Sequence, residues 1–428
     1  MNQSMTVPTA SSSLQHWLDY WDSIHVTAID LGLERIRPVA QQLDLLKPNA
    51  EVITVAGTNG KGSTTTTIAA IYQAADYQVG LYQSPHIYRF NERIKLNGVQ
   101  IDDKLLIAAF VEVEQARVAC NLSLSFFEAT TLAAFVIFKQ QRCDVWVLEV
   151  GLGGRLDAVN LIDPDVAVIT NIGLDHVDWL GDSIEKIAFE KAGIMRPNIP
   201  VVFSEANVPD AIIDQAAKLN CQLLVGERDY VWRYDDAVFY YASPAATLAL
   251  PLPQLAMVNV AAAISAVLLS ALHISEQAIA YGVAHAHIAG RFEVRQFNDR
   301  TIILDVAHNV HGVNFLLKQL AFYQQQHPGK HRHIRLVFSM LADKDIIGVA
   351  ALLKPVTQHW YIAPLNGVRA ASMQQLRDAV SDAQTSEHQD IAAAFAAALQ
   401  DSQLQDIIIV CGSFHTLEAV WESLASWQ

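Results

Sequence analysis

A glycine-rich loop between an apolar strand and a helix constrains this chain more than any other feature. Residues 52–56 are mostly β-branched or apolar, which predicts a buried strand. The loop that follows is Gly57-Thr58-Asn59-Gly60-Lys61-Gly62-Ser63, and helix-like sequence continues to Ala75. Glycine lets backbone N–H groups approach phosphate oxygens, while the helix N-terminus and the lysine supply positive charge. The segment therefore predicts an α/β domain that binds the phosphates of ATP or GTP.

The loop departs from the standard phosphate-binding pattern G-x-x-x-x-G-K-[ST]. Val55 stands where the first glycine is expected, and Gly62 separates the lysine from the hydroxyl of Ser63. A glycine-rich surface turn is the alternative interpretation. We favour a nucleotide site, because strand, lysine and helix all fall where phosphate binding needs them.

Composition narrows the class of protein. Hydrophobic residues make up 52% of the 428 residues, enough for a sizeable core. The chain carries 29 basic and 44 acidic residues, a net charge of −15, which argues against a nucleic-acid partner and against binding to a membrane surface. Four scattered cysteines without CxxC spacing indicate a reducing compartment and no structural zinc.

No targeting segment is predicted. The N-terminus lacks the basic and apolar regions of a signal peptide, and no apolar run approaches the ~20 residues of a membrane span. We therefore expect a cytoplasmic protein. The sequence shows no extended heptad pattern, so a monomer is the expected state.

Strand and helix patterns alternate along most of the chain, which predicts parallel sheets covered by helices. We place a domain boundary between a first domain, 1–296, and a second, 297–428. The first-domain strands are expected at 52–56, 79–82, 145–150, 166–171 and 201–203, with β-rich sequence at 230–252. Helices are expected at 63–75, 104–119, 128–141, 184–193 and 257–272, and second-domain strands at 301–306, 335–338, 359–362 and 406–410.

Polar residues follow the predicted strands of the first domain. Glu149 ends one strand just before a glycine turn, and Asp175-His176 follow the next. Ligands of parallel sheets bind beyond the carboxyl ends of the strands, and Mg²⁺ takes one or two protein carboxylates there. The alternatives are a buried Glu149 paired with an arginine, a solvated Lys191 at a helix end, and an ordinary polar connector at 84–93.

The second domain repeats this arrangement. Its predicted strands end at Asp305, at Met340 and at Cys411-Gly412-Ser413. These residues predict a second half-site that faces a cleft between the domains. Arg291, close to the boundary, could reach phosphates across that cleft, although it could equally be a surface arginine in a linker.

An ordered set of motifs resembles the folylpolyglutamate synthase family of the Mur ligase superfamily, and in particular its bifunctional branch that also makes dihydrofolate. The resemblance spans roughly residues 15 to 425. It rests on the phosphate loop together with Ser84-Pro85-His86, Glu149, Gly153-Gly154-Arg155-Leu156-Asp157-Ala158, Asp175-His176, Glu190-Lys191-Ala192-Gly193 and Asp305-Val306-Ala307-His308-Asn309.

The resemblance implies a P-loop-containing, mainly parallel-sheet N-terminal ATPase domain that also binds the pterin, followed by a smaller Rossmann-like α/β C-terminal glutamate ligase domain. It implies an ATP- and Mg²⁺-dependent acid–amino-acid ligase with two metal sites. The enzyme would add L-glutamate to 7,8-dihydropteroate and then extend reduced folates with further glutamates through an acyl phosphate. Its partners would be these small molecules.

The resemblance also implies roles for single residues. Ser84, Glu149 and His176 match the Mg²⁺ ligands, and Lys61, Lys191 and His176 match catalytic positions. Lys191 also matches a lysine that is carbamylated. The ATP contacts would be Gly57, Thr58, Asn59, Gly60, Lys61, Gly62, Ser63, Asn259, Arg291 and Asp305. The segments that bind dihydropteroate would be Ser125-Phe126-Phe127-Glu128 and Leu156-Asp157-Ala158, and glutamate would meet His308 and Ser413.

One departure from the family stands at the domain junction, where Ala289 replaces a frequent proline before Gly290-Arg291. The arginine is kept, so the departure affects hinge stiffness rather than the ATP contact. Three other functions remain open: a folylpolyglutamate synthase without the first activity, a Mur-type ligase acting on a peptidoglycan precursor, and a nucleotide sensor with a decayed site. Decay would remove Lys61, Glu149 or Lys191, and all three are present.

Overall fold

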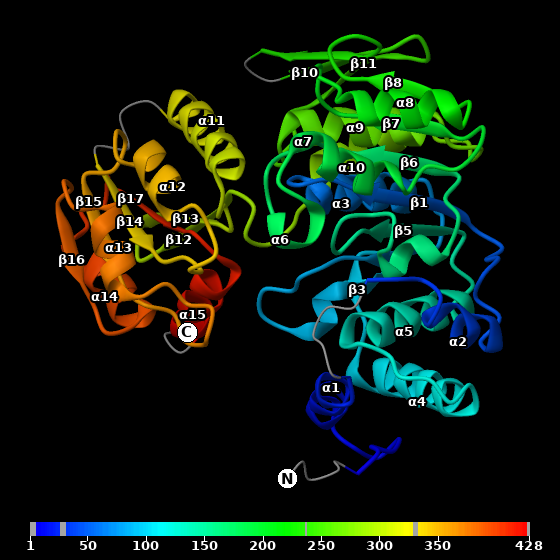
Figure 1. The fold of residues 1–428 in the computed structure, drawn as a ribbon. Helices are drawn as coiled ribbons and strands as arrows, with labels where there is room; N and C mark the ends of the chain where they lie inside the picture. The colour runs from blue at the N-terminus through cyan, green and yellow to red at the C-terminus, as the bar shows by residue number, and fades with distance from the viewer. Residues whose placement is uncertain (1–5, 26–30, 236–237, 328–332, 426–428) are drawn as a thin grey trace. The chain divides into compact units, whose positions relative to one another are not determined.

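Figure 1 shows the computed structural model, which describes residues 6–25, 31–235, 238–327 and 333–425. The chain forms two compact units. The first comprises Met1–His86 and Phe90–His287, and the second comprises Ile87–Arg89 and Ile288–Gln428.

The first unit is built on an eight-stranded sheet with the order β4-β3-β2-β5-β1-β6-β7-β8. Strands β2, β5, β1, β6, β7 and β8 run parallel, and β3 and β4 form an antiparallel edge. The bounds are β1 (Glu51–Ala56), β2 (Val79–Tyr82), β3 (Ile94–Leu96), β4 (Val99–Gln100), β5 (Val145–Glu149), β6 (Val166–Ile169), β7 (Pro200–Phe203) and β8 (Gln222–Val225).

Helices cover both faces of this sheet (Figure 1). On one face, Val52, Trp146 and Leu148 belong to the same apolar cluster as α1 (Leu14–Ser23), α2 (Ile36–Gln42), α4 (Asp103–Ala119), α5 (Phe126–Gln140), α7 (Ile184–Ala192) and α8 (Asp210–Lys218). Alternate strand residues such as Ile53 and Val55 point to the opposite face. There the sheet meets α3 (Lys61–Ala74) and α9 (Met257–Leu268), and α10 (Glu276–His285) packs on α3.

A small antiparallel sheet follows in the β-rich region of the sequence. It consists of β9 (Val231–Tyr234), β10 (Val238–Ala242) and β11 (Thr247–Pro251), in the order β11-β10-β9. Buried and exposed side chains alternate along β11, as expected for a sheet with one solvated face. Residues 236 and 237 of the predicted β-rich segment lie outside the described residues.

The second unit contains a six-stranded sheet in the order β12-β13-β17-β14-β15-β16, parallel except for the β12–β13 pair. Its strands are β12 (Glu293–Phe297), β13 (Arg300–Asp305), β14 (Ile334–Phe338), β15 (His359–Ile362), β16 (Thr385–Glu387) and β17 (Ile407–Cys411). Helices α11 (Val310–Gln326), α12 (Ile346–Leu353) and α13 (Met373–Ala379) cover one face, and α14 (Ile391–Asp401) and α15 (Phe414–Ala425) cover the other.

These two mixed α/β units confirm the predicted fold class. The strands predicted at 79–82 and 359–362 have the predicted bounds. The strand predicted to reach Asn171 ends at Ile169, and the helix predicted to reach residue 272 ends at Leu268. Strand β12 spans the boundary predicted after residue 296 and lies in the second unit, because it pairs with β13 along its whole length.

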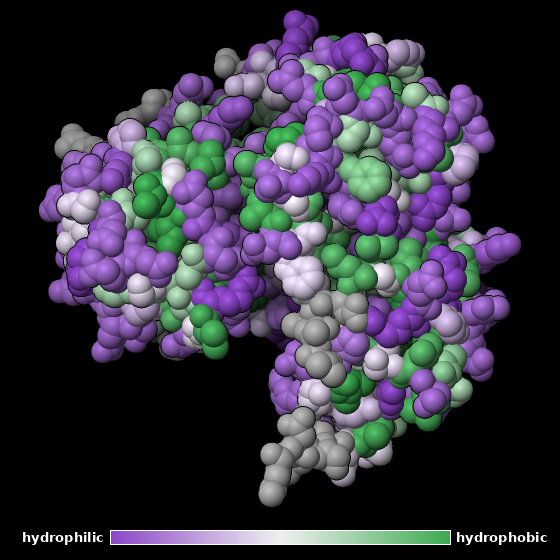
Figure 2. All heavy atoms as spheres, in the orientation of Figure 1, coloured by the Kyte–Doolittle hydropathy of each residue, from purple (hydrophilic) through white to green (hydrophobic). Residues whose placement is uncertain are grey.

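The visible surface is mostly hydrophilic (Figure 2), although hydrophobic residues make up 52% of the chain. Figure 2 shows that hydrophilic side chains cover most of the visible face, with smaller hydrophobic areas between them. Among the residues that the structure describes, no helix combines the length and apolar character needed to cross a membrane.

Candidate active site

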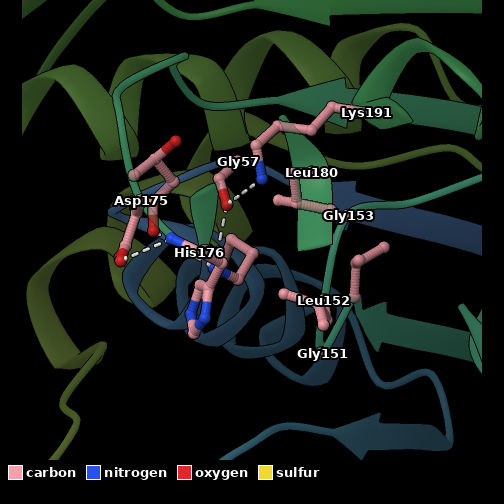
Figure 3. Close-up of a pocket in the computed structure, with 11 residues that line it drawn as sticks. Gly57, Gly151, Leu152, Gly153, Asp175, His176, Leu180 and Lys191 are labelled. Atoms are coloured by element: carbon pink, nitrogen blue, oxygen red, sulfur yellow. Dashed lines mark hydrogen bonds between the residues drawn. The ribbon is translucent and has the colours of Figure 1, made fainter. Parts of the chain in front are cut away.

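The carboxyl ends of β2, β5, β1 and β6 lie at the same edge of the parallel sheet, so the loops that follow these strands meet there. A pocket opens at this edge (Figure 3). The segments that line it follow β1, β5 and β6 or belong to helices α6 (Val177–Leu180) and α7. The lining residues are Gly57, Thr58, Lys61, Val150, Gly151, Leu152, Gly153, Asp175, His176, Leu180 and Lys191.

The phosphate loop has the tight backbone that its glycines permit. Gly57 has φ 151° and Gly60 has φ 84°, a region that side-chain-bearing residues rarely occupy. A Cβ on Gly57 would collide with Thr170, and one on Gly60 would collide with the amide of Asn259 on α9. Gly60 is also the N-cap of α3, so the loop runs directly into the helix N-terminus. The structure thus places Asn259, a predicted ATP contact, against the loop.

Two residues at the end of β6 hold the loop in place. The backbone N–H of Thr58 donates to the Asn171 carbonyl at 3.1 Å, and the N–H of Asn59 donates to Asn171 Oδ1 at 2.9 Å. Thr170 Oγ1 donates to the Asn59 carbonyl at 2.5 Å. Sequence reasoning assigned no role to Thr170 or Asn171. The available signal was two polar residues in succession at the end of a buried strand.

Two lysines converge on one carbonyl of the loop. Lys61 Nζ and Lys191 Nζ each donate to the oxygen of Gly57 at 2.9 Å. Figure 3 shows Lys191 reaching Gly57 from α7. Burial, together with the charge of Lys61, lowers the pKa of Lys191 from 10.5 to about 7. Lys191 is therefore a buried amine, and the alternative of a solvated helix lysine is wrong.

The end of α7 is fixed by close backbone contacts with the loop after β5. Arg155 donates its backbone N–H to the Glu190 carbonyl at 2.8 Å, and its guanidinium pairs with the Glu190 carboxylate at 2.8 Å. A Cβ on Gly154 would lie 2.8 Å from the Glu190 carbonyl, and one on Gly193 would strike the Arg155 backbone. The Gly153-Gly154-Arg155 and Glu190-Lys191-Ala192-Gly193 motifs are thus one packing unit that positions Lys191.

Asp157 shapes the loop after β5. Its carboxylate accepts the backbone N–H groups of Leu152 at 2.8 Å and Val159 at 3.0 Å. Burial raises the pKa of Asp157 from 3.8 to about 6, and the N–H donors only partly offset that rise. Leu156 and Ala158 flank it in the same loop. The contact of these three residues with dihydropteroate stays a prediction.

The predicted metal ligands come from three different strand ends. Glu149 is the last residue of β5 and is buried, Ser84 lies just after β2 and is half-buried, and His176 is exposed at the start of α6. His176 lines the pocket, as does Val150 next to Glu149. Within the described part of the chain, no group of three or more His, Cys, Asp and Glu side chains is arranged to hold a metal. A site with few protein ligands, completed by water and phosphate oxygens, suits Mg²⁺.

The 125–128 segment begins α5. Ser125 and Glu128 form a capping box, and Glu128 also accepts two hydrogen bonds of 2.8 Å from Arg35. Phe127 packs on the loop after β5, where a Cβ on Gly151 would lie 2.5 Å from its ring. The two phenylalanines are half-buried, whereas Ser125 and Glu128 are buried in structural contacts. The aromatic rings are therefore the members of this segment best placed to meet a flat ligand.

The predicted residues of the second unit gather at the ends of β13 and β17. Asp305 accepts the backbone N–H groups of Phe292 and Ala307, each at 2.8 Å. Burial raises its pKa, and the Arg291 guanidinium opposes that rise. The rings of Phe414 and His308 are 6.2 Å apart, and Arg291 lies 5.4 Å from the centre of the Phe414 ring. Ser413, next to Phe414, is buried and bonds Thr416. Their roles toward ATP and glutamate stay predictions.

Substitution of Gly154 by alanine tests the packing unit that positions Lys191. The added Cβ would press on the Glu190 carbonyl and the Lys191 Cα, which are backbone atoms and cannot rotate away. We expect a lower thermal unfolding midpoint, equivalent to about 1–3 kcal/mol. Gly173→Ala is the matched control, because its Cβ would meet Thr58 only at an ordinary 3.5 Å. Equal midpoints for the two variants would contradict this account.

Comparison with known proteins finds relatives over almost the whole chain. Residues 55–238 match the Mur ligase middle domain, and residues 290–414 match the Mur ligase glutamate ligase domain. The Dihydrofolate synthase/folylpolyglutamate synthase of Escherichia coli is 43% identical over 418 residues, which cover 97% of this chain and 96% of the relative.

Two solved structures show the same fold over nearly the full length. E. coli FolC in complex with DHPP and ADP has a TM-score of 0.93 and 41% identity, covering 98% of this chain and 100% of that one. A bifunctional folylpolyglutamate synthase/dihydrofolate synthase with Mn, AMPPNP and L-glutamate bound has a TM-score of 0.91 and 42% identity, with the same coverage.

Proposed function

The chain belongs to the dihydrofolate synthase/folylpolyglutamate synthase family of Mur-type ligases, and from this premise we propose how its site carries out the reaction. It is an ATP- and divalent-metal-dependent acid–amino-acid ligase that joins L-glutamate to 7,8-dihydropteroate and extends folates with further glutamates. The observation that carries the site assignment is the convergence of Lys61 and buried Lys191 on the Gly57 carbonyl of the phosphate loop.

The reaction has two steps. A carboxylate oxygen of the acceptor attacks the γ-phosphorus of ATP, the bond from that phosphorus to the β–γ bridging oxygen breaks, and ADP leaves. The amine of glutamate then attacks the acyl carbon, the carbon–oxygen bond to phosphate breaks, and inorganic phosphate leaves as the nitrogen loses a proton. The first step requires neutralisation of phosphate charge more than covalent help from the protein.

The phosphate loop supplies that neutralisation. Its backbone N–H groups lie at the N-terminus of α3, which carries partial positive charge, and Lys61 adds a full charge. Lys61 donates to the Gly57 and Thr58 carbonyls, so its ammonium is held inside the loop. We assign Gly57 to Ser63 to the ATP phosphates, with Asn259, Arg291 and Asp305 as further ATP contacts.

The donor set fits a magnesium ion. Glu149 supplies a buried carboxylate, Ser84 a hydroxyl and His176 an imidazole, and water and phosphate oxygens would complete the coordination. When bound, the metal ions, of which we propose two, withdraw charge from the transferred phosphate. The protein's own contribution is to hold these three side chains at one edge of the sheet, at or after the ends of three separate strands.

The remaining assignments concern the other substrates and the assembly. We assign the acceptor to Ser125-Phe126-Phe127-Glu128 and Leu156-Asp157-Ala158, because Phe127 packs directly on the loop that lines the pocket. Glutamate is assigned to His308 and Ser413. We also propose that the chain works as a cytoplasmic monomer without a nucleic-acid partner, consistent with its net charge of −15.

An assay with two acceptors tests the function. Purified protein receives ATP, Mg²⁺ and L-glutamate with either dihydropteroate or a reduced folate, and phosphate release and the ligated product are measured. We expect turnover with both acceptors. Turnover with the reduced folate alone would leave only folylpolyglutamate synthase activity, and no turnover with either would reject the proposed function.

Carbamylation of Lys191 is a second testable feature. The neutral amine attacks CO₂, forming a nitrogen–carbon bond and releasing a proton, and this turns a cation into an anion beside the phosphate loop. With a pKa of about 7, half of the Lys191 amine is neutral at pH 7, against roughly 1 in 3,000 for a lysine at 10.5. We therefore expect carbamate occupancy to rise with pH around 7 rather than above 10.

Nuclear magnetic resonance with ¹³C-bicarbonate measures that occupancy, and Lys191→Arg serves as the control without a signal. Lys191→Ala should abolish turnover, and small carboxylates should restore part of it. A signal that appears only above about pH 9, or full activity in Lys191→Ala, would reject the carbamate.

A further inference from the structure

Arg93 is a cation near the candidate active site to which the reaction has so far given no role. It ends the 3₁₀ helix η1 (Phe90–Arg93), between β2 and β3. Its guanidinium lies 5.2 Å from the ring centre of Phe90 and 5.9 Å from that of Phe126. Phe126 belongs to the segment that we assign to the acceptor, and Glu149, at the metal end of the site, attracts the Arg93 charge. Arg93 therefore lies beside a ring that we assign to the acceptor and interacts electrostatically with a predicted metal ligand.

In the part of the chain that the structure describes, a hydrogen bond to the Arg93 guanidinium is made at its Nε edge. Its Nε–H donates to His86 Nδ1 at 2.8 Å, so Nδ1 is the acceptor of the His86 ring. Across the described residues, no carboxylate lies within 4.0 Å of this guanidinium, whereas Arg35 and Arg155 each carry such an ion pair. The Arg93 side chain is half-buried. Among the described residues its four Nη–H donors form no ion pair, so we assign them to a ligand.

The surroundings make this arrangement costly unless an anion is bound. Burial lowers the pKa of Arg93, while Tyr82 and Glu149 oppose the shift. A guanidinium stays protonated at neutral pH, so Arg93 is a partly desolvated positive charge that no described residue neutralises in an ion pair. A planar fork of N–H donors is the geometry that binds carboxylates in a bidentate manner.

We propose that Arg93 binds the carboxylate of the acceptor, the group that becomes the acyl phosphate, and that His86 orients Arg93 by accepting its Nε–H. The proposal rests on the proposed function, because it names the substrate group held at that site. The Arg93 guanidinium lies beside Phe126, and Phe127 packs on Gly151 of the pocket lining, so the two rings that we assign to the acceptor connect Arg93 with the pocket. The cation also offsets the repulsion between the acceptor carboxylate and the γ-phosphate. Arg93 therefore determines specificity for acceptors that carry a carboxylate.

A pair of acceptors that differ only in this group provides the test. Binding of dihydropteroate and of its analogue lacking the carboxylate is measured by calorimetry in the presence of ADP. The intact protein should bind dihydropteroate roughly 10–100-fold more tightly than the analogue. In Arg93→Gln that ratio should fall to about 1, because dihydropteroate weakens while the analogue keeps its affinity.

Two further variants control this measurement. Arg233 also lies over an aromatic ring of the same unit, 4.9 Å from the centre of Tyr240, so Arg233→Gln should keep the full ratio. Arg93→Lys keeps the charge without the planar fork and should give an intermediate ratio. ADP binding shows whether Arg93→Gln is folded. If that variant does not bind ADP, the affinity ratio in Arg93→Lys decides whether Arg93 binds the carboxylate.

Two results separate this inference from the function on which it rests. Equal weakening of both ligands in Arg93→Gln, or an unchanged ratio in either Arg93 variant, would overturn the role of Arg93 while the intact enzyme still turns over. Failure of the intact protein to release phosphate with either dihydropteroate or the reduced folate would instead overturn the proposed function.

Discussion

The structure of the site depends on two ammonium groups that share one backbone carbonyl. Lys61 and Lys191 both donate to Gly57, so their nitrogens lie within about 6 Å of one another. Two full charges at that distance repel by roughly 3 kcal/mol at an effective dielectric constant near 20. Burial is the larger cause of the lowered Lys191 pKa, and this repulsion adds to it, so that the pKa is about 7. A lysine that is neutral for about half of the time at pH 7 can react with CO₂.

Glycines and short polar side chains make this convergence possible. Gly57 and Gly60 allow the loop to approach Thr170 and Asn259, and Gly154 allows α7 to approach the loop after β5. Each of these three glycines faces a backbone atom or a buried side chain. A methyl group on any of the three would therefore displace a segment at the pocket. The parallel order β5-β1-β6 brings these loops to one edge of the sheet. The hydrogen bonds of Asn171 connect the phosphate loop after β1 to the loop after β6. The chemistry therefore depends on packing as much as on the charged residues.

Local patterns predicted much of this arrangement, and long-range burial decided the rest. The phosphate loop follows from glycine, lysine and strand spacing, and the strand at 79–82 has the predicted bounds. Burial of Lys191 depends on tertiary contacts, although its place four residues after Ile187 puts it on the apolar face of α7. Arg93 could not be assigned a role from the sequence, because that role depends on the Phe126 ring and the Glu149 carboxylate, which lie far from Arg93 along the chain. The N-terminal helix α1 was not predicted; Trp17 is buried by stacking on Phe110, with ring centres 5.9 Å apart.

Transfer of oxygen from the acceptor to phosphate tests the central claim, that this site phosphorylates a carboxylate before it forms an amide. Dihydropteroate labelled with ¹⁸O in its carboxylate is turned over with ATP and glutamate, and the released phosphate is analysed by mass spectrometry. Attack of the carboxylate on the γ-phosphorus followed by loss of phosphate transfers one ¹⁸O atom to each phosphate formed. One label per phosphate, matched to one amide bond, is the predicted result. Unlabelled phosphate released together with the amide product would contradict an acyl phosphate and the chemistry assigned to this site.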